Sequence, residues 1–95
     1  MTVTAGEVRE VETPHGPARV HLVPGEGRGV LLIGHGAGGG VSAPDIVAAA
    51  GVAGAMGLHV GLVEQPYRVA GRRAPAPAAQ LDAAWTVVCA DVRGL

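Results

Sequence analysis

The pattern of apolar and polar residues divides the chain into short alternating stretches followed by continuous apolar runs. Glu7–Thr13 and Ala18–Val23 are two valine-rich stretches on either side of Pro14–Pro17, which has the composition of a turn. In the second stretch, apolar residues occupy every other position, which is typical of a strand with one buried face. These residues predict an antiparallel hairpin.

Two later runs are apolar without alternation. Gly29–Ile33 and Leu58–Val63 suit strands of a parallel sheet that helices cover on both faces. Of the two, Gly29–Ile33 is the expected centre of the fold.

Two helices are expected between and after these strands. The first has Ser42 as its N-cap and Pro44 and Asp45 in its first turn, and it ends near Met56. The second covers Ala78–Val92, where apolar residues recur at helical spacing. A hairpin followed by strand, helix, strand and helix predicts an α/β domain with a parallel sheet and right-handed crossovers.

Composition narrows the class of protein. The 95 residues allow one domain, and 48% hydrophobic against 16% charged residues favours a folded core over disorder. The net charge is -1 and every basic residue is arginine, so there is no excess positive field to hold a nucleic acid. The single cysteine, Cys89, cannot form an internal disulfide and is expected to be a buried structural thiol. The first residues lack the features of a secretory signal, and a cytoplasmic location fits best.

The uncharged run Ile46–Val63 is long enough to raise the question of a membrane span. Gly57, however, occupies a position at which a helix would end and a strand would begin, so no membrane association is expected. His15, His21 and His59 lack the spacing of metal ligands, and no metal is expected.

A glycine-rich loop, Gly34–Gly40, has two chemical interpretations. Its glycines match the dinucleotide-binding pattern Gly-x-Gly-x-x-Gly at 34–39, with Glu64 at the end of the next strand as the ribose-binding acid. In such domains the helix follows the glycines at once, whereas extra residues intervene here. The other interpretation is an oxyanion loop, because a His-Gly pair at the carboxyl end of a strand lets the backbone turn sharply and directs N–H groups into the cleft.

The connection Glu64–Pro77 is longer than the usual strand-to-helix loop and is expected to overhang that cleft. Its arginines suit the carboxylate or phosphate of a substrate, although a solvated loop is an equally simple interpretation. The candidate substrate-binding residues in this connection are Tyr67, Arg68, Arg72 and Arg73.

The segment Leu32–Gly39 resembles the first oxyanion-hole loop of the α/β-hydrolase superfamily. The chain is similar, over almost its whole length, to a dienelactone-hydrolase-like subgroup that includes testis-expressed hydrolase-like proteins and a regulatory subunit of a histone acetyltransferase complex. The further matching features are Ala43-Pro44, Pro66-Tyr67, Arg72-Arg73 and Ala84-Trp85.

The resemblance implies the N-terminal part of an α/β-hydrolase sheet, truncated before the nucleophile strand. The complete protein would be a serine-type hydrolase of small esters, lactones or other acyl substrates, without a cofactor. Ala37, with Gly38 as second choice, would donate its backbone N–H to the oxyanion, and His35 would have a structural role. The glycines that permit the turn are Gly34, Gly36 and Gly39.

No nucleophile is expected within the chain, because its only serine, Ser42, is the predicted helix cap. The chain alone is therefore expected to be inactive, and a complementing chain or a second copy would pair with the exposed edge of Gly29–Ile33. Two alternatives stay open: a Rossmann-like nucleotide-binding module and a non-catalytic pseudo-hydrolase that acts as an interaction protein.

Overall fold

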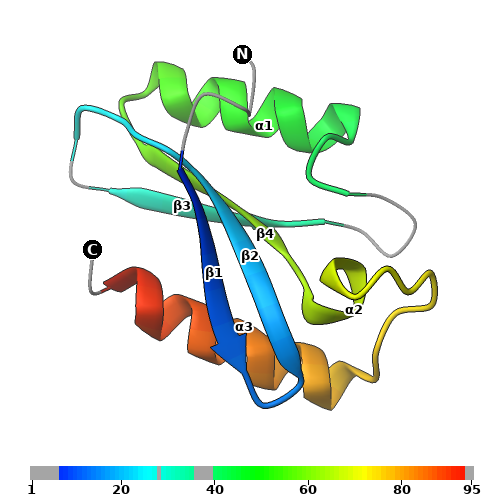
Figure 1. Cartoon of the computed structure of the whole chain (residues 1–95). Coiled ribbons are helices and arrows are strands. Elements are labelled where there is room, and N and C mark those ends of the chain that lie inside the picture. Colours follow the sequence, from blue (N-terminus) through cyan, green and yellow to red (C-terminus); the bar gives the residue numbers. More distant parts are fainter. Residues whose placement is uncertain (1–6, 28, 36–39, 94–95) are drawn as a thin grey trace.

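The computed structural model describes residues 7–27, 29–35 and 40–93 (Figure 1). The strands in these ranges are β1 (Glu7–Thr13), β2 (Gly16–Val23), β3 (Val30–Gly34) and β4 (His59–Glu64). The helices are α1 (Pro44–Ala55), α2 (Pro66–Val69) and α3 (Ala78–Arg93).

The strands form one mixed sheet with the order β1-β2-β4-β3. β1 and β2 pair antiparallel, β2 and β4 pair antiparallel, and β3 and β4 pair parallel. The predicted hairpin, the predicted parallel pair and the α/β class are confirmed. The sequence did not indicate that β2 would also pair with β4, so the sheet is mixed rather than parallel after its hairpin.

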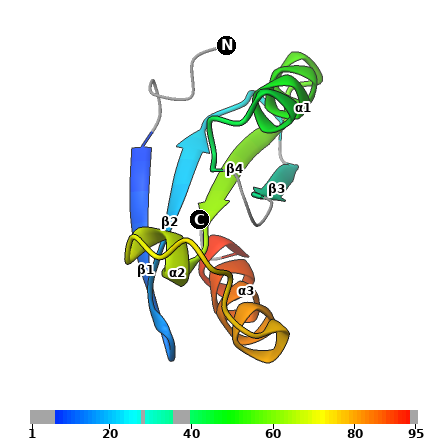
Figure 2. The same cartoon turned by 90° about the vertical axis from the view of Figure 1, so that its right-hand side faces the viewer.

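Helices cover the sheet on both sides (Figures 1 and 2). α3 packs against β1 and β2 on one face, and α1 packs against β3 and β4 on the other. The core on the α3 side consists of Val11, Ala18, Val20, Val63, Val88 and Val92. The core on the α1 side consists of Ile46, Ala50, Ala53, Val60 and Leu62. An ion pair between Arg9 Nε and Asp91 Oδ2 at 2.5 Å also joins β1 to α3, and its hydrogen bond raises the pKa of Arg9.

The expectation that Gly29–Ile33 would be the centre of the fold is wrong for the described chain. β3 lies at the edge of the sheet, where Val30 is 45% and Leu31 is 38% exposed. The strand covered on both faces is β4, in which Val60, Leu62 and Val63 are fully buried. A continuous apolar run indicates that a strand suits burial, but it does not say which of two such strands has neighbours on both sides.

A two-residue turn joins β1 to β2 and is shorter than the predicted turn Pro14–Pro17. The Thr13 hydroxyl donates to the Gly16 carbonyl oxygen at 2.6 Å, and the backbone N–H of His15 donates to the Thr13 hydroxyl at 3.1 Å. Gly16 has φ 105°, a conformation that favours glycine. These bonds fix the direction in which His15 leaves the hairpin.

The N-cap of α1 is Ala43, not Ser42 as predicted. The helix begins at Pro44, which needs no N–H partner in the first position, and the Ala43 N–H donates to the Gly40 carbonyl oxygen at 3.1 Å. Ser42 is therefore one residue too early for its hydroxyl to accept the N–H groups of the first turn.

Gly57 ends α1 as predicted. It has φ 83°, its N–H donates to the Gly54 carbonyl oxygen at 3.0 Å, and the Leu58 N–H donates to the Ala53 carbonyl oxygen at 3.1 Å. The uncharged run is thus divided between a helix and a strand. In the part of the chain that the structure describes, no helix has the length and apolar character needed to cross a membrane.

The connection predicted as a loop over Glu64–Pro77 is partly regular. β4 continues through Glu64, and Pro66 starts the single turn of α2. The Ala70 N–H donates to the Pro66 carbonyl oxygen at 2.9 Å, after which Gly71 at φ 80° reverses the chain. Proline favoured a helix start at this position, which the prediction overlooked.

Candidate functional site

The carboxyl ends of β3 and β4 lie side by side, because the two strands run parallel with Gly34 opposite Val63. The chain leaves β3 at His35 and leaves β4 at Gln65, directly before α2. Ligand sites of open α/β sheets commonly lie at such strand ends. This end of the sheet is the candidate site.

His35 joins the two strand ends. Its Nε2 accepts a hydrogen bond from the Gln65 backbone N–H at 3.1 Å, so the neutral ring carries its proton on Nδ1. The edge of its ring meets Tyr67, with 5.7 Å between the ring centroids and an angle of 71° between the planes. His35 is therefore a half-buried link between the end of β3 and α2, and its Nε2 is already engaged by the main chain.

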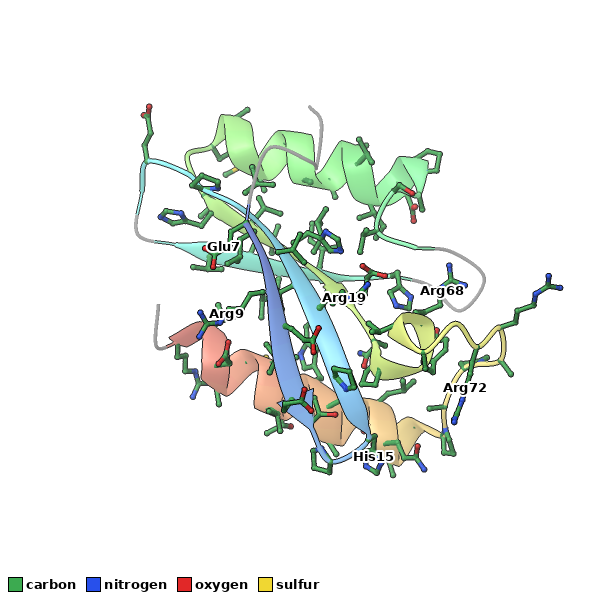
Figure 3. The ribbon with its side chains drawn as sticks, in the orientation of Figure 1. Glu7, Arg9, His15, Arg19, Arg68 and Arg72 are labelled. Atoms are coloured by element: carbon green, nitrogen blue, oxygen red, sulfur yellow. The ribbon has the colours of Figure 1, made fainter. Side chains whose placement is uncertain are left out.

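Arg68 extends from α2 toward the other end of the glycine-rich segment (Figure 3). Its Nη2 lies 3.3 Å from the position that a Cβ atom at Gly40 would occupy. Among the described residues, no acidic side chain forms an ion pair with Arg68. A cation without a carboxylate partner thus stands beside the residue that precedes the turn into α1.

The structure brings four of the predicted site residues together: Gly34, His35, Tyr67 and Arg68. Arg72 and Arg73 lie on the exposed connection between α2 and α3. The other predicted residues, Gly36, Ala37, Gly38 and Gly39, lie outside the described residues.

Two sulfur and hydroxyl groups were weighed as nucleophiles. Ser42 is exposed, and its hydroxyl forms no hydrogen bond with a histidine or carboxylate in the described part of the chain. Cys89 is half-buried on α3, rather than fully buried as expected. Trp85 packs over Gly34, with its Cζ3 atom 3.4 Å from the position of an added Cβ atom, as its helical spacing with the core predicted.

Sequence reasoning missed a contact between His21 Nε2 and Glu64 Oε1, which joins β2 to β4. Both side chains are about four-fifths buried. The sequence held no signal for this pair, because the pairing of β2 with β4 was not predicted. The contact argues against Glu64 as a ribose-binding acid, since its carboxylate already has a partner. In residues 7–27, 29–35 and 40–93, no group of three or more His, Cys, Asp or Glu side chains is arranged to hold a metal.

A pocket lies next to the candidate site, between the hairpin turn, α2 and the start of α3. It has about 390 Å³ of empty space, part of which is open to solvent. The residues that line it are His15, Pro66, Tyr67, Ala70, Arg72, Ala76, Gln80 and Leu81. Of these, Tyr67 and Arg72 were predicted as substrate-binding residues. His15 and Gln80 were not, because they come from segments far away in the sequence.

Comparisons with protein families, curated proteins and solved structures gave no match to this chain. The argument for function therefore rests on the geometry at the strand ends and on the resemblance of the loop motif.

Proposed function

We propose that the chain carries the oxyanion-hole loop of a serine-type α/β hydrolase that acts on small ester, lactone or other acyl substrates. The observation that supports this most is the end of β3. There the motif Gly34-His35-Gly36 begins beside the parallel strand β4, and the His35 ring accepts the N–H of the residue that follows β4. An acyl hydrolase needs a loop of this kind at the carboxyl end of its sheet.

The chemistry assigned to the loop is electrostatic. The backbone N–H of Ala37, with Gly38 as second choice, would donate to the oxygen that becomes negative in the tetrahedral intermediate. Preorganised donors of this kind act where charge develops, and removal of one costs about 3 kcal/mol in the barrier. His35 is a positioning residue in this scheme, because its Nε2 is occupied by the Gln65 N–H and is not available to deprotonate a nucleophile.

The nucleophile has to come from polypeptide outside these 95 residues, because Ser42 has no base within the described chain. The outer edge of β3 suits such a contribution. Val30 and Leu31 are partly exposed there, and β3 pairs with β4 on its other side. A further strand parallel to β3 would end next to the loop, and pairing would also cover an apolar edge that otherwise invites association.

The test uses the polypeptide as its source produces it, isolated through this chain, with a fluorophosphonate probe and p-nitrophenyl butyrate as reagents. We expect labelling of a serine outside residues 1–95 and hydrolysis of the ester. Ala37→Pro removes the proposed donor and should lower kcat by about 10²–10³-fold. Ala37→Gly keeps the N–H and should retain activity near the unsubstituted level.

Several outcomes would contradict the proposal. Labelling of the isolated 95-residue chain that disappears in Ser42→Ala would mean that the chain has its own nucleophile. Equal activity of Ala37→Pro and Ala37→Gly would remove the donor role. A strand partner on β3 without any labelled serine would favour the second candidate, a non-catalytic interaction protein, which the free edge of β3 also supports. Saturable NAD(H) binding that a bulky residue at position 36 abolishes would favour the nucleotide-binding module.

A further inference from the structure

The pocket beside the candidate site combines polar side chains from four separate segments. His15 comes from the hairpin turn, Tyr67 from α2, Arg72 from the following connection and Gln80 from the first turn of α3. Figure 3 shows the first and third of these, His15 at the hairpin and Arg72 on the connection. The rest of the lining is apolar: Pro66, Ala70, Ala76 and Leu81.

The charge of this pocket is not balanced by the protein. No aspartate or glutamate lines it, and the first turn of α3, which contributes Gln80 and Leu81, contains no acidic residue. Arg72 forms no ion pair with any described residue. Arg72 is also the one lining side chain that is charged at every pH at which a protein folds. The pocket therefore presents a single permanent positive charge.

Tyr67 adds a hydrogen-bonding group without a partner. The residue is 6% exposed, yet its hydroxyl forms no hydrogen bond with a described residue. No fully buried side-chain oxygen or nitrogen in the described ranges lacks a partner, so this hydroxyl reaches accessible surface. A phenol that is largely buried and has no protein partner is an available donor for a ligand.

These groups together fit a carboxylate. A guanidinium binds a carboxylate through two parallel hydrogen bonds, and the Tyr67 hydroxyl and the Gln80 amide are further donors. One permanent cation matches a single negative charge better than the double charge of a phosphate ester. The apolar half of the lining has room for a short hydrocarbon chain.

We infer that the pocket formed by His15, Tyr67, Arg72 and Gln80 binds the carboxylate of a short aliphatic acid. Tyr67 also touches His35, so the pocket and the end of β3 share a wall. If the chain serves an acyl hydrolase, the pocket selects acyl substrates that carry a carboxylate away from the bond that is cleaved. The binding site stands on the pocket alone, and its assignment to a substrate rests on the proposed function.

Binding is measured by nuclear magnetic resonance on the ¹⁵N-labelled full chain, with butyrate, the neutral isostere butyramide and inorganic phosphate as probes. Butyrate should shift the amide signals of Arg72 and Gln80 in a saturable way, and butyramide should bind at least about tenfold more weakly. Arg72→Gln should weaken butyrate binding by about tenfold or more. The matched control Arg93→Gln, on the exposed last turn of α3, should change it less than about twofold.

Equal binding of butyrate and butyramide would overturn the inference, as would tighter binding of phosphate, equal effects of the two substitutions, or no saturable shift with any probe. Since Arg72 is exposed, its substitution leaves the fold intact, which the same spectra verify. The hydrolysis assay separates the two proposals. Butyrate binding without ester hydrolysis leaves the pocket and removes the hydrolase. Hydrolysis with equal KM for monomethyl succinate and methyl butyrate leaves the hydrolase and removes the pocket's role in it.

Discussion

The two ends of the parallel pair β3 and β4 differ in how completely their polar groups are satisfied. At the amino end, His59 uses both ring nitrogens: Nδ1 accepts the Gly25 N–H at 2.9 Å, and Nε2 donates to the Gly27 carbonyl oxygen at 2.7 Å. The Gly27 N–H donates in turn to the Gly57 carbonyl oxygen at 2.8 Å. The loop before β3 is thus fastened to the turn before β4.

The carboxyl end is fastened by fewer bonds and keeps groups in reserve. Its printed link between the strand ends is the hydrogen bond from Gln65 to His35. Arg68 and Arg72 have no ion pair among the described residues, and the Tyr67 hydroxyl has no protein partner there. The comparison teaches that one end of the sheet is built for connection and the other for binding, since groups that stabilise nothing in the protein are available to a ligand.

The largest effect is expected at the tightest contact of the amino end. A methyl group at Gly25 would overlap the main-chain carbonyl of Leu58 and lie 2.6 Å from the carbonyl oxygen of Gly57. Because main chain cannot move aside as a side chain can, Gly25→Ala should lower the free energy of unfolding by about 2–3 kcal/mol in urea denaturation. Gly51→Ala is the control. Position 51 is open and helical, so alanine should stabilise the chain by about 0.5–1 kcal/mol. Equal effects at the two positions would mean that the amino end is not closely packed.

His59→Ala should have the next largest effect. It leaves the Gly25 N–H and the Gly27 carbonyl without their partners and should cost about 2 kcal/mol of unfolding free energy. His15→Ala, which removes an exposed ring, should change the unfolding free energy by less than about 0.5 kcal/mol. Hydrogen exchange at Gly25 would rise in the first variant only, and unchanged exchange there would contradict the role given to His59.

His35→Ala tests the carboxyl end in the same way and should cost less, about 1 kcal/mol, because one hydrogen bond to the main chain and one ring contact are lost. The exchange rate of the Gln65 amide is the direct measurement. A loss as large as that of His59→Ala would abolish the contrast between the two ends.

Arg68→Gln should have the smallest effect on stability, within about 0.5 kcal/mol, because the guanidinium has no ion pair to lose among the described residues. Thermal unfolding at low and high salt checks this. A marked destabilisation that salt removes would show that Arg68 stabilises the fold and is not held for a ligand.

The sequence predicted the elements better than their neighbours. Alternation identified the hairpin, continuous apolar runs identified β3 and β4, and Gly57 marked the end of α1. The assignment of the centre to Gly29–Ile33 failed, because an apolar run carries no information on strand order. Ser42 failed as a cap because a proline two residues later fixed the helix start.

The candidate site followed the same division. His35 and Tyr67 were found from local motifs, since each stands directly after a predicted strand. The pair of His21 with Glu64 and the contribution of His15 to the pocket depend on the antiparallel pairing of β2 with β4. That pairing brings the hairpin turn to the carboxyl end of β4, and no local pattern encodes it.

The spatial order of the strands also has a consequence for synthesis on the ribosome. β4 lies between β2 and β3 but is made after β3, and thirty residues separate Gly34 from Glu64. At about 5–20 residues per second, the partner of β3 is completed about 2–6 s after β3 itself. During that interval the nascent chain presents Val30–Ile33 without its final neighbour, and this segment is the natural point of contact for a holding chaperone.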